Sequence, residues 1–153
     1  MWDYPRPPRV EPSAELVVVT FGGVVVAETT AALRVLETSH PPAYYLPREA
    51  FIDGALEPAP GSSFCEFKGL ATYLDLVSGP PGDVRSPGAA WTYPDPTPGF
   101  EILTGHVSLY PGRMDRVTVD GEVVRPQEGD FYGGWITDRV VGPFKGAPGT
   151  RFW

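Results

Sequence analysis

The stretch LRVLETSHPPAYYLPREAF, residues 33–51, holds a histidine, two acids, two arginines, two adjacent tyrosines and three prolines. Proline fixes φ and restricts the residue before it, so this segment loses little conformational freedom when the chain folds. A rigid segment that is dense in hydrogen-bonding side chains is suited to form one wall of a binding site. We expect Glu37, His40, Tyr45 and Arg48 to face one cleft, with Lys68 and Trp91 opposite.

Around this stretch, glycine and proline separate many short segments rich in β-branched and aromatic residues. The 18 glycines and 19 prolines are interleaved with four Trp, seven Tyr and eight Phe, and 42% of the chain is apolar. This pattern predicts a mainly β, loop-rich domain. Residues 16–28 predict a hairpin with a Gly-Gly turn, partly buried on both faces, and residues 117–124 predict a hairpin with an Asp-Gly turn.

Other segments give weaker indications. Residues 29–38 have two leucines at helical spacing but fit a short helical turn and a strand equally well. Residues 47–49 predict a short helical turn that Gly54 ends. Residues 62–77 predict one long strand with a β-bulge at Lys68-Gly69, because the apolar alternation changes phase there. Residues 79–88 predict a surface loop, and residues 106–110 predict a strand with Val107 and Leu109 on one face.

Charge and cysteine content exclude several classes of protein. The net charge of −7 and the absence of a run of Lys or Arg argue against nucleic-acid and anionic-membrane partners. The single cysteine, Cys65, excludes an intrachain disulfide and a cysteine-based zinc cluster. The apolar runs at 16–19 and 24–27 are too short to span a bilayer, and residues 1–5 do not resemble a signal peptide.

These features predict one cytoplasmic domain that needs no metal and no cofactor. Residues 1–15 are expected to form a Pro-rich extended arm, residues 16–128 the core, and residues 129–153 an aromatic, Gly/Pro-rich C-terminal extension packed on the core. The oligomeric state stays open.

Nearly the whole chain resembles the family catalogued as domain of unknown function 427, which carries a nucleotidyltransferase-like label. The matching segments are RVEPS at 9–13, FGG at 21–23, LRVLETSHPP at 33–42, YYLPRE at 44–49, Cys65, KG at 68–69, AWTYP at 90–94, GHV at 105–107 and LY at 109–110. Residues 131–153 resemble a longer subset of the family, which includes plant members. The block from 37 to 48 is the specific part of this match.

The resemblance implies a β-tent fold, in which two antiparallel sheets lean together as in the ligand-binding domain of cereblon. Relatives with that fold often hold a zinc ion with four cysteines. This chain departs from them, because it has one cysteine and must replace the zinc with side-chain packing.

The nucleotidyltransferase-like label is not supported by the residues. That chemistry commonly uses Gly-Ser followed by two carboxylates, two residues apart, that hold metal ions. Gly61-Ser62 is followed by Asp75, but the residue two positions later is Val77. The chain also lacks a phosphate-binding Gly-x-x-x-x-Gly-Lys-Ser/Thr loop.

Each candidate side chain also has a structural interpretation. His40 is either a general base or ligand contact, or a residue that fixes a loop. Trp91 and Tyr93 either line a pocket or fill the core. Cys65 is expected in the core more than as a nucleophile, and a solvated side chain is the commoner outcome for Lys68. Glu37 and Arg48 either pair with each other or contact a ligand.

Three functions remain open at this stage. The favoured hypothesis is a small-molecule-binding domain whose site contains Glu37, His40, Tyr45, Arg48, Lys68, Trp91 and Tyr93. The second is an enzyme, acid–base or nucleotidyltransferase-like, that uses Glu37, His40 and Lys68. The third is a protein-interaction module built on the Pro-rich arm and the acidic surface.

Overall fold

The protein is mainly β, with thirteen short strands and three single-turn 3₁₀ helices in the described part of the chain. The computed structural model describes residues 9–36, 42–65, 68–78, 84–126 and 134–137. The elements are β1 (Arg9–Ser13), β2 (Val17–Phe21), β3 (Val24–Thr29), β4 (Ala32–Leu36), β5 (Ala43–Pro47), η1 (Arg48–Ala50), β6 (Leu56–Cys65), β7 (Gly69–Ser78), β8 (Val84–Thr92), η2 (Glu101–Leu103), β9 (His106–Leu109), η3 (Pro111–Arg113), β10 (Arg116–Val119), β11 (Glu122–Val123), β12 (Arg125–Pro126) and β13 (Trp135–Ile136).

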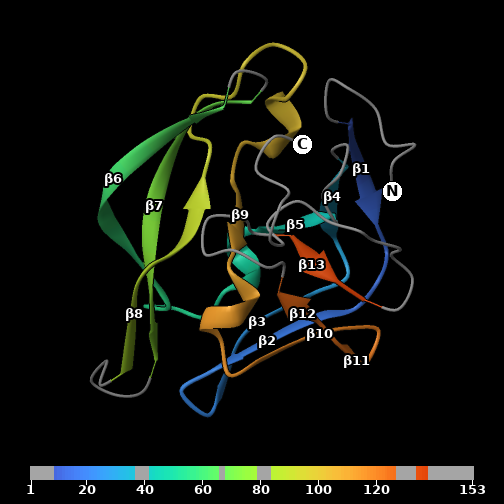
Figure 1. Ribbon diagram of the computed structural model, residues 1–153, viewed down its shortest axis with the longest axis vertical. Coiled ribbons are helices and arrows are strands. Elements are labelled where there is room, and N and C mark those ends of the chain that lie inside the picture. The colour runs from blue at the N-terminus through green and yellow to red at the C-terminus, as the bar shows by residue number, and fades with distance from the viewer. Residues whose placement is uncertain (1–8, 37–41, 66–67, 79–83, 127–133, 138–153) are drawn as a thin grey trace, which may run out of the picture.

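The strands form two antiparallel sheets and a small ribbon. The larger sheet has the order β1-β4-β5-β9-β8-β7-β6, the smaller sheet has the order β11-β10-β2-β3, and β12 pairs with β13. In Figure 1 the larger sheet curves over the molecule, from β6 and β7 on one side to β1 on the other, and the smaller sheet closes it below. The predicted fold class, mainly β with two antiparallel sheets and short helical turns, is confirmed.

The main core fills the space between the two sheets. The smaller sheet contributes a row of buried valines from β2 and β10, including Val17, Val19 and Val117. The larger sheet contributes alternate residues of its central strands, such as Val107 and Leu109 of β9, which are fully buried. This burial of β-branched and aliphatic side chains is the main term that holds the sheets together.

Both hairpins expected from their turn residues are present. Gly22 and Gly23 have φ values of 61° and 75° between β2 and β3, and Asp120 and Gly121 have φ values of 49° and 83° between β10 and β11. Positive φ at both central residues is the requirement of a type I′ turn, which glycine and aspartate tolerate. The predicted burial on both faces of the first hairpin is confirmed only in part, because residues 24–25 at the start of β3 are exposed.

The prediction of one strand over residues 62–77 is wrong. The chain reverses direction between Cys65 and Gly69, which pair with each other as the last and first residues of β6 and β7. The phase change at Lys68-Gly69 therefore marks a hairpin turn, in which Gly69 has a φ of 109°, and not a β-bulge. The register shifts of β7 and its partners lie elsewhere, between residues 58 and 62 and between residues 74 and 76.

The segment at 29–38, which fits helix and strand equally well in sequence, forms strand β4. Both faces of β4 are buried, since four of its five residues have almost no exposed surface. A strand covered on both sides loses the apolar–polar alternation that normally identifies it, which explains the ambiguity. The predicted turn after Pro47 is present as η1, whereas the predicted loop at 79–88 is wrong from Val84 onward, where β8 begins.

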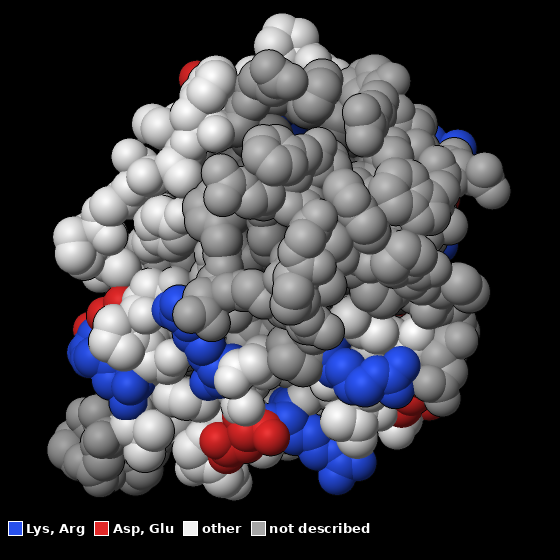
Figure 2. All heavy atoms as spheres, in the orientation of Figure 1, with Lys and Arg blue, Asp and Glu red and all other residues white. Residues whose placement is uncertain are grey.

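Charged side chains of both signs lie on the outside of these sheets. Figure 2 shows acidic and basic groups side by side on the described part of one face. On the β6–β8 side, Arg85 bridges two strands by donating to Asp75 at 2.7 Å and to Glu57 at 2.9 Å. None of the helices in the described ranges is long and apolar enough to cross a membrane.

Trp135 of β13 joins the ribbon to the core. Its side chain is fully buried, stacks on Tyr44 with ring centroids 4.9 Å apart, and donates its indole N–H to the carbonyl of Leu109 at 3.2 Å. Its backbone N–H donates to the carbonyl of Pro42 at 2.8 Å. A residue late in the chain thus packs against two central strands of the larger sheet.

Replacing Trp135 with alanine should destabilise the protein strongly. The substitution leaves a large cavity beside Tyr44 and removes a buried hydrogen bond, so we expect a loss of about 3–5 kcal/mol in the free energy of unfolding. Phe64 of β6 is 73% exposed and gives the matched control, because F64A should change stability by less than about 0.5 kcal/mol. Chemical denaturation of both variants measures the difference, and equal stabilities would contradict the role given to Trp135.

Candidate functional site

The face of the larger sheet that points away from the smaller sheet carries a group of aromatic rings. Strand residues alternate between faces, so Val107 and Leu109 of β9 enter the main core while Ser108 lies on the other face. Trp91 of β8 pairs with Tyr73 of β7 on one side and with Ser108 of β9 on the other. Residues that pair directly across antiparallel strands share a face, so these three side chains lie next to one another on that face.

Tyr45, Tyr73, Trp91, Tyr93 and Tyr110 make up this aromatic cluster. The ring centroids of Tyr45 lie 6.2 Å from Tyr93 and 6.3 Å from Trp91, and those of Trp91 and Tyr110 lie 4.7 Å apart. These separations are typical of interacting aromatic pairs. Tyr45 and Tyr93 are buried, whereas Tyr73, Trp91 and Tyr110 are half-buried and present part of their surface to solvent.

Polar atoms of the cluster are bonded to one another. The indole N–H of Trp91 donates to the hydroxyl of Tyr45 at 3.0 Å. Burial raises the pKa of the Tyr110 hydroxyl, and the nearby Tyr73 raises it further, against the opposing effect of the Arg113 guanidinium. The Tyr110 hydroxyl is therefore neutral at ordinary pH.

Two cations lie against the rings of this cluster. The ammonium nitrogen of Lys68 is 5.8 Å from the ring centroid of Tyr93, and the guanidinium of Arg113 is 4.8 Å from that of Tyr110. These distances fit cation–π contacts. Lys68 is 6% exposed. Its side chain is therefore buried, whereas a solvated side chain is the commoner outcome for lysine.

The position of Lys68 is fixed by the loop after β8. Its carbonyl accepts a hydrogen bond from the N–H of Thr97 at 3.0 Å. The next residue, Gly69, lies so close to this loop that a Cβ there would contact backbone atoms of Asp95 and Thr97 at 3.4 Å. The hairpin turn and the loop thus hold Lys68 beside Tyr93.

Among the described residues, Ser108 is one of three whose side chains have a buried polar atom without a hydrogen-bond partner, the others being Arg34 and Ser78. Ser108 is fully buried, and its hydroxyl has no hydrogen-bond partner among the described residues. A buried hydroxyl without a partner costs free energy, so such groups are uncommon unless water or a ligand completes them. Ser108 lies on the same face as Trp91 and Tyr110, and this places the unsatisfied hydroxyl within the aromatic cluster.

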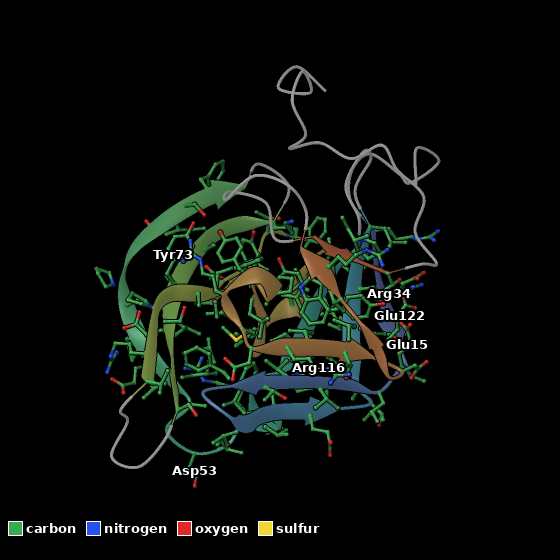
Figure 3. All side chains as sticks on the ribbon, turned by 60° about the horizontal axis from the view of Figure 1, so that its bottom comes forward. Glu15, Arg34, Asp53, Tyr73, Arg116 and Glu122 are labelled. Carbon is green, nitrogen blue, oxygen red and sulfur yellow. The ribbon has the colours of Figure 1, made fainter. Side chains whose placement is uncertain are left out.

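A second polar network lies where β1, β4 and β5 meet. Glu15 accepts hydrogen bonds from the hydroxyls of Ser13 at 2.7 Å and Tyr44 at 2.8 Å, and Arg34 pairs with Glu11 and approaches Glu15 at 4.0 Å. Burial raises the pKa of the Tyr44 hydroxyl, and the bond to Glu15 raises it further, against the effect of Arg34. In Figure 3, Glu15 and Arg34 lie on the opposite side of the molecule from Tyr73. The network connects strands and is separate from the aromatic cluster.

The structure brings together four of the side chains selected from the sequence: Tyr45, Lys68, Trp91 and Tyr93. Arg48 is exposed at the start of η1, where its backbone N–H donates to the carbonyl of Gly105 at 2.9 Å. Glu37 and His40 lie outside the described residues, as does the side chain of Cys65. The predicted Glu37–Arg48 pair and the acid–base group of Glu37, His40 and Lys68 therefore stay predictions.

Sequence reasoning did not select Tyr73, Ser108 or Arg113. The alternation over residues 106–110 already puts Ser108 on the face of Tyr110, but a lone serine gives no further signal. Tyr73 joins the cluster because β7 pairs with β8, which the prediction of a single strand over 62–77 concealed. Within the described ranges, no group of three His, Cys, Asp or Glu side chains is placed to hold a metal ion.

Comparison with models of known protein families places the chain in a family. A family model described as "Domain of unknown function (DUF427)" matches residues 9–120, which is well over half of the chain and includes every residue of the aromatic cluster. No curated protein matches the chain.

Removing the hydroxyl of Ser108 should not destabilise the unliganded protein. Because S108A deletes a buried group without a partner, we expect the free energy of unfolding to stay level or to rise by about 1 kcal/mol. The matched control is T92V on the same sheet, since the buried Thr92 hydroxyl donates to the carbonyl of His106 at 2.7 Å. That variant should lose about 1 kcal/mol. Equal losses in the two variants, measured by urea denaturation, would show that Ser108 has a partner.

The raised pKa of Tyr44 predicts a loss of stability in alkaline solution. The folded state holds this proton to higher pH than the unfolded state, whose tyrosine pKa is near 10.0. The stabilisation is therefore complete below pH 10 and is lost as the pH rises through the folded pKa. Y44F should fall less steeply than the wild type above pH 10 in denaturation measured at a series of pH values. Parallel curves would contradict this origin.

Proposed function

The chain belongs to the family described as "Domain of unknown function (DUF427)", and we propose that it is a domain that binds a small molecule on the aromatic cluster. The observation that carries this proposal is the fully buried hydroxyl of Ser108, which has no described partner and lies among aromatic rings. A ligand atom that bonds to this hydroxyl would recover the free energy that its burial costs.

The composition of the cluster supports the proposal. Small-molecule sites are mostly apolar and aromatic, with a few polar groups that orient the ligand. Here five rings supply the apolar surface, while Ser108, Lys68 and the tyrosine hydroxyls supply the polar groups. The half-buried rings of Tyr73, Trp91 and Tyr110 leave surface for a ring to stack on.

The site is also built on rigid elements. The pairing of β7, β8 and β9 fixes Tyr73, Trp91 and Ser108 relative to one another, and Tyr45 comes from β5, which pairs with β9. Side chains held by a sheet are preorganised, so a ligand meets them with little further loss of conformational entropy. We place the domain in the cytoplasm, since its single cysteine fits a reducing compartment.

A thermal-shift screen against nucleotides, cyclic imides and central metabolites should identify compounds that raise the melting temperature. A ligand present at a hundred times its dissociation constant adds about 2.7 kcal/mol of stability, which such a screen detects. For each compound that binds, W91A should weaken binding at least about tenfold, because base–aromatic stacking is worth about 1–3 kcal/mol per ring.

The control for this screen is F64A, which removes an exposed aromatic ring from the same sheet outside the cluster. This variant should bind as tightly as the wild type. The proposal fails if no compound raises the melting temperature, or if W91A and F64A bind every compound equally well.

A further inference from the structure

We infer that the ligand is a planar ring compound that carries an anionic oxygen group, a carboxylate or a phosphate. This inference rests on the proposed function and adds the chemical class of the ligand. It begins from the row of rings, in which Tyr93, Tyr45, Trp91 and Tyr110 follow one another at centroid separations of 6.2, 6.3 and 4.7 Å. A cation lies at each end of this row, Lys68 at Tyr93 and Arg113 at Tyr110.

Arg113 differs in its partners from Arg34 and Arg85. Arg34 pairs with Glu11 and Glu15, and Arg85 pairs with Glu57 and Asp75. The guanidinium of Arg113 instead donates to the carbonyls of Pro87 and Gly88, at 3.1 and 3.4 Å. In the described ranges, no carboxylate lies within ion-pair distance of it. An exposed guanidinium in that state is ready to bind an anion, since it presents several donors in a planar fork.

Lys68 lies at the buried end of the row, where it is 6% exposed and its ammonium nitrogen is 5.8 Å from the ring centroid of Tyr93. A ligand that reaches this end of the row meets a second cation close to the rings, in addition to Arg113.

The ring of Trp91 is half-buried and keeps part of its surface exposed, and Trp91 lies directly across from the buried Ser108. A ring compound that stacks on the exposed part of Trp91 would bring its anionic group toward a cation. Such a ligand needs a ring that stacks on Trp91 and an anionic group that pairs with a cation. Neutral apolar compounds lack the anionic group.

Two matched pairs of compounds test the inference by isothermal titration calorimetry: indole-3-acetate with indole-3-acetamide, and adenosine 5′-monophosphate with adenosine. Within each pair the ring is constant and the anionic group is removed. We expect at least one anion to bind about tenfold or more tightly than its neutral partner, as charge-assisted hydrogen bonds are stronger than neutral ones. Comparison of the two pairs shows whether carboxylate or phosphate is the preferred group.

Variants locate the effect at the two cations. R113M should weaken binding of the preferred anion about tenfold and leave its neutral partner unchanged, while R113K should restore most of the affinity by keeping the charge. Arg113 is exposed, so these variants should fold even if K68M does not. R116M removes an exposed arginine from β10 in the smaller sheet (Figure 3) and should have no effect.

The outcomes separate the inference from the proposed function. If the neutral compounds bind as tightly as the anions, or if R113M and K68M both bind the anion as the wild type does, the inference is overturned while the small-molecule site remains. If none of the four compounds binds at millimolar concentration and the wider screen gives no ligand, the proposed function fails and the inference fails with it.

Discussion

The structure depends on two adjacent tyrosines that lie on opposite faces of β5. Tyr44 enters the core between the sheets, where it stacks on Trp135 and donates to Glu15. Tyr45 lies in the aromatic cluster, where it accepts a hydrogen bond from Trp91. Because side chains alternate along a strand, a shift of one residue in the register of β5 would exchange these two environments. The packing that stabilises the fold therefore also sets the position of the candidate site.

Turn chemistry was the part of the fold that the sequence predicted best. Gly-Gly and Asp-Gly turns need only local information, since their backbone requires positive φ at two consecutive residues. Tertiary burial explains the failures. Strand β4 is covered on both faces and so lacks alternation, and the phase change near Lys68 is equally typical of a bulge and of a reversal of the chain. Which of these occurs depends on the pairing of β7 with both neighbours, which spans distant segments.

The same limit applies to the candidate site. Tyr45, Lys68 and Trp91 stand out in the sequence as an adjacent tyrosine pair, a residue beside a glycine, and a large aromatic residue in a strand. Ser108 and Tyr73 become visible only when β7, β8 and β9 pair in register, because each lies across from Trp91 on a different strand. Ser108 also breaks the rule that buried polar groups are bonded, and such exceptions are where functional sites are expected.

Asp75 has a structural role that connects two neighbouring strands of the larger sheet. It is the carboxylate that a nucleotidyltransferase-like reading of Gly61-Ser62 would use, yet it accepts bonds from the N–H of Gly88 at 2.9 Å and from Arg85 at 2.7 Å. These partners, the backbone N–H first, lower the pKa of the Asp75 carboxyl. Its negative charge is thus used to connect β7 with β8. The anionic ligand proposed for the aromatic cluster would instead meet the cations Lys68 and Arg113, which lie against its rings.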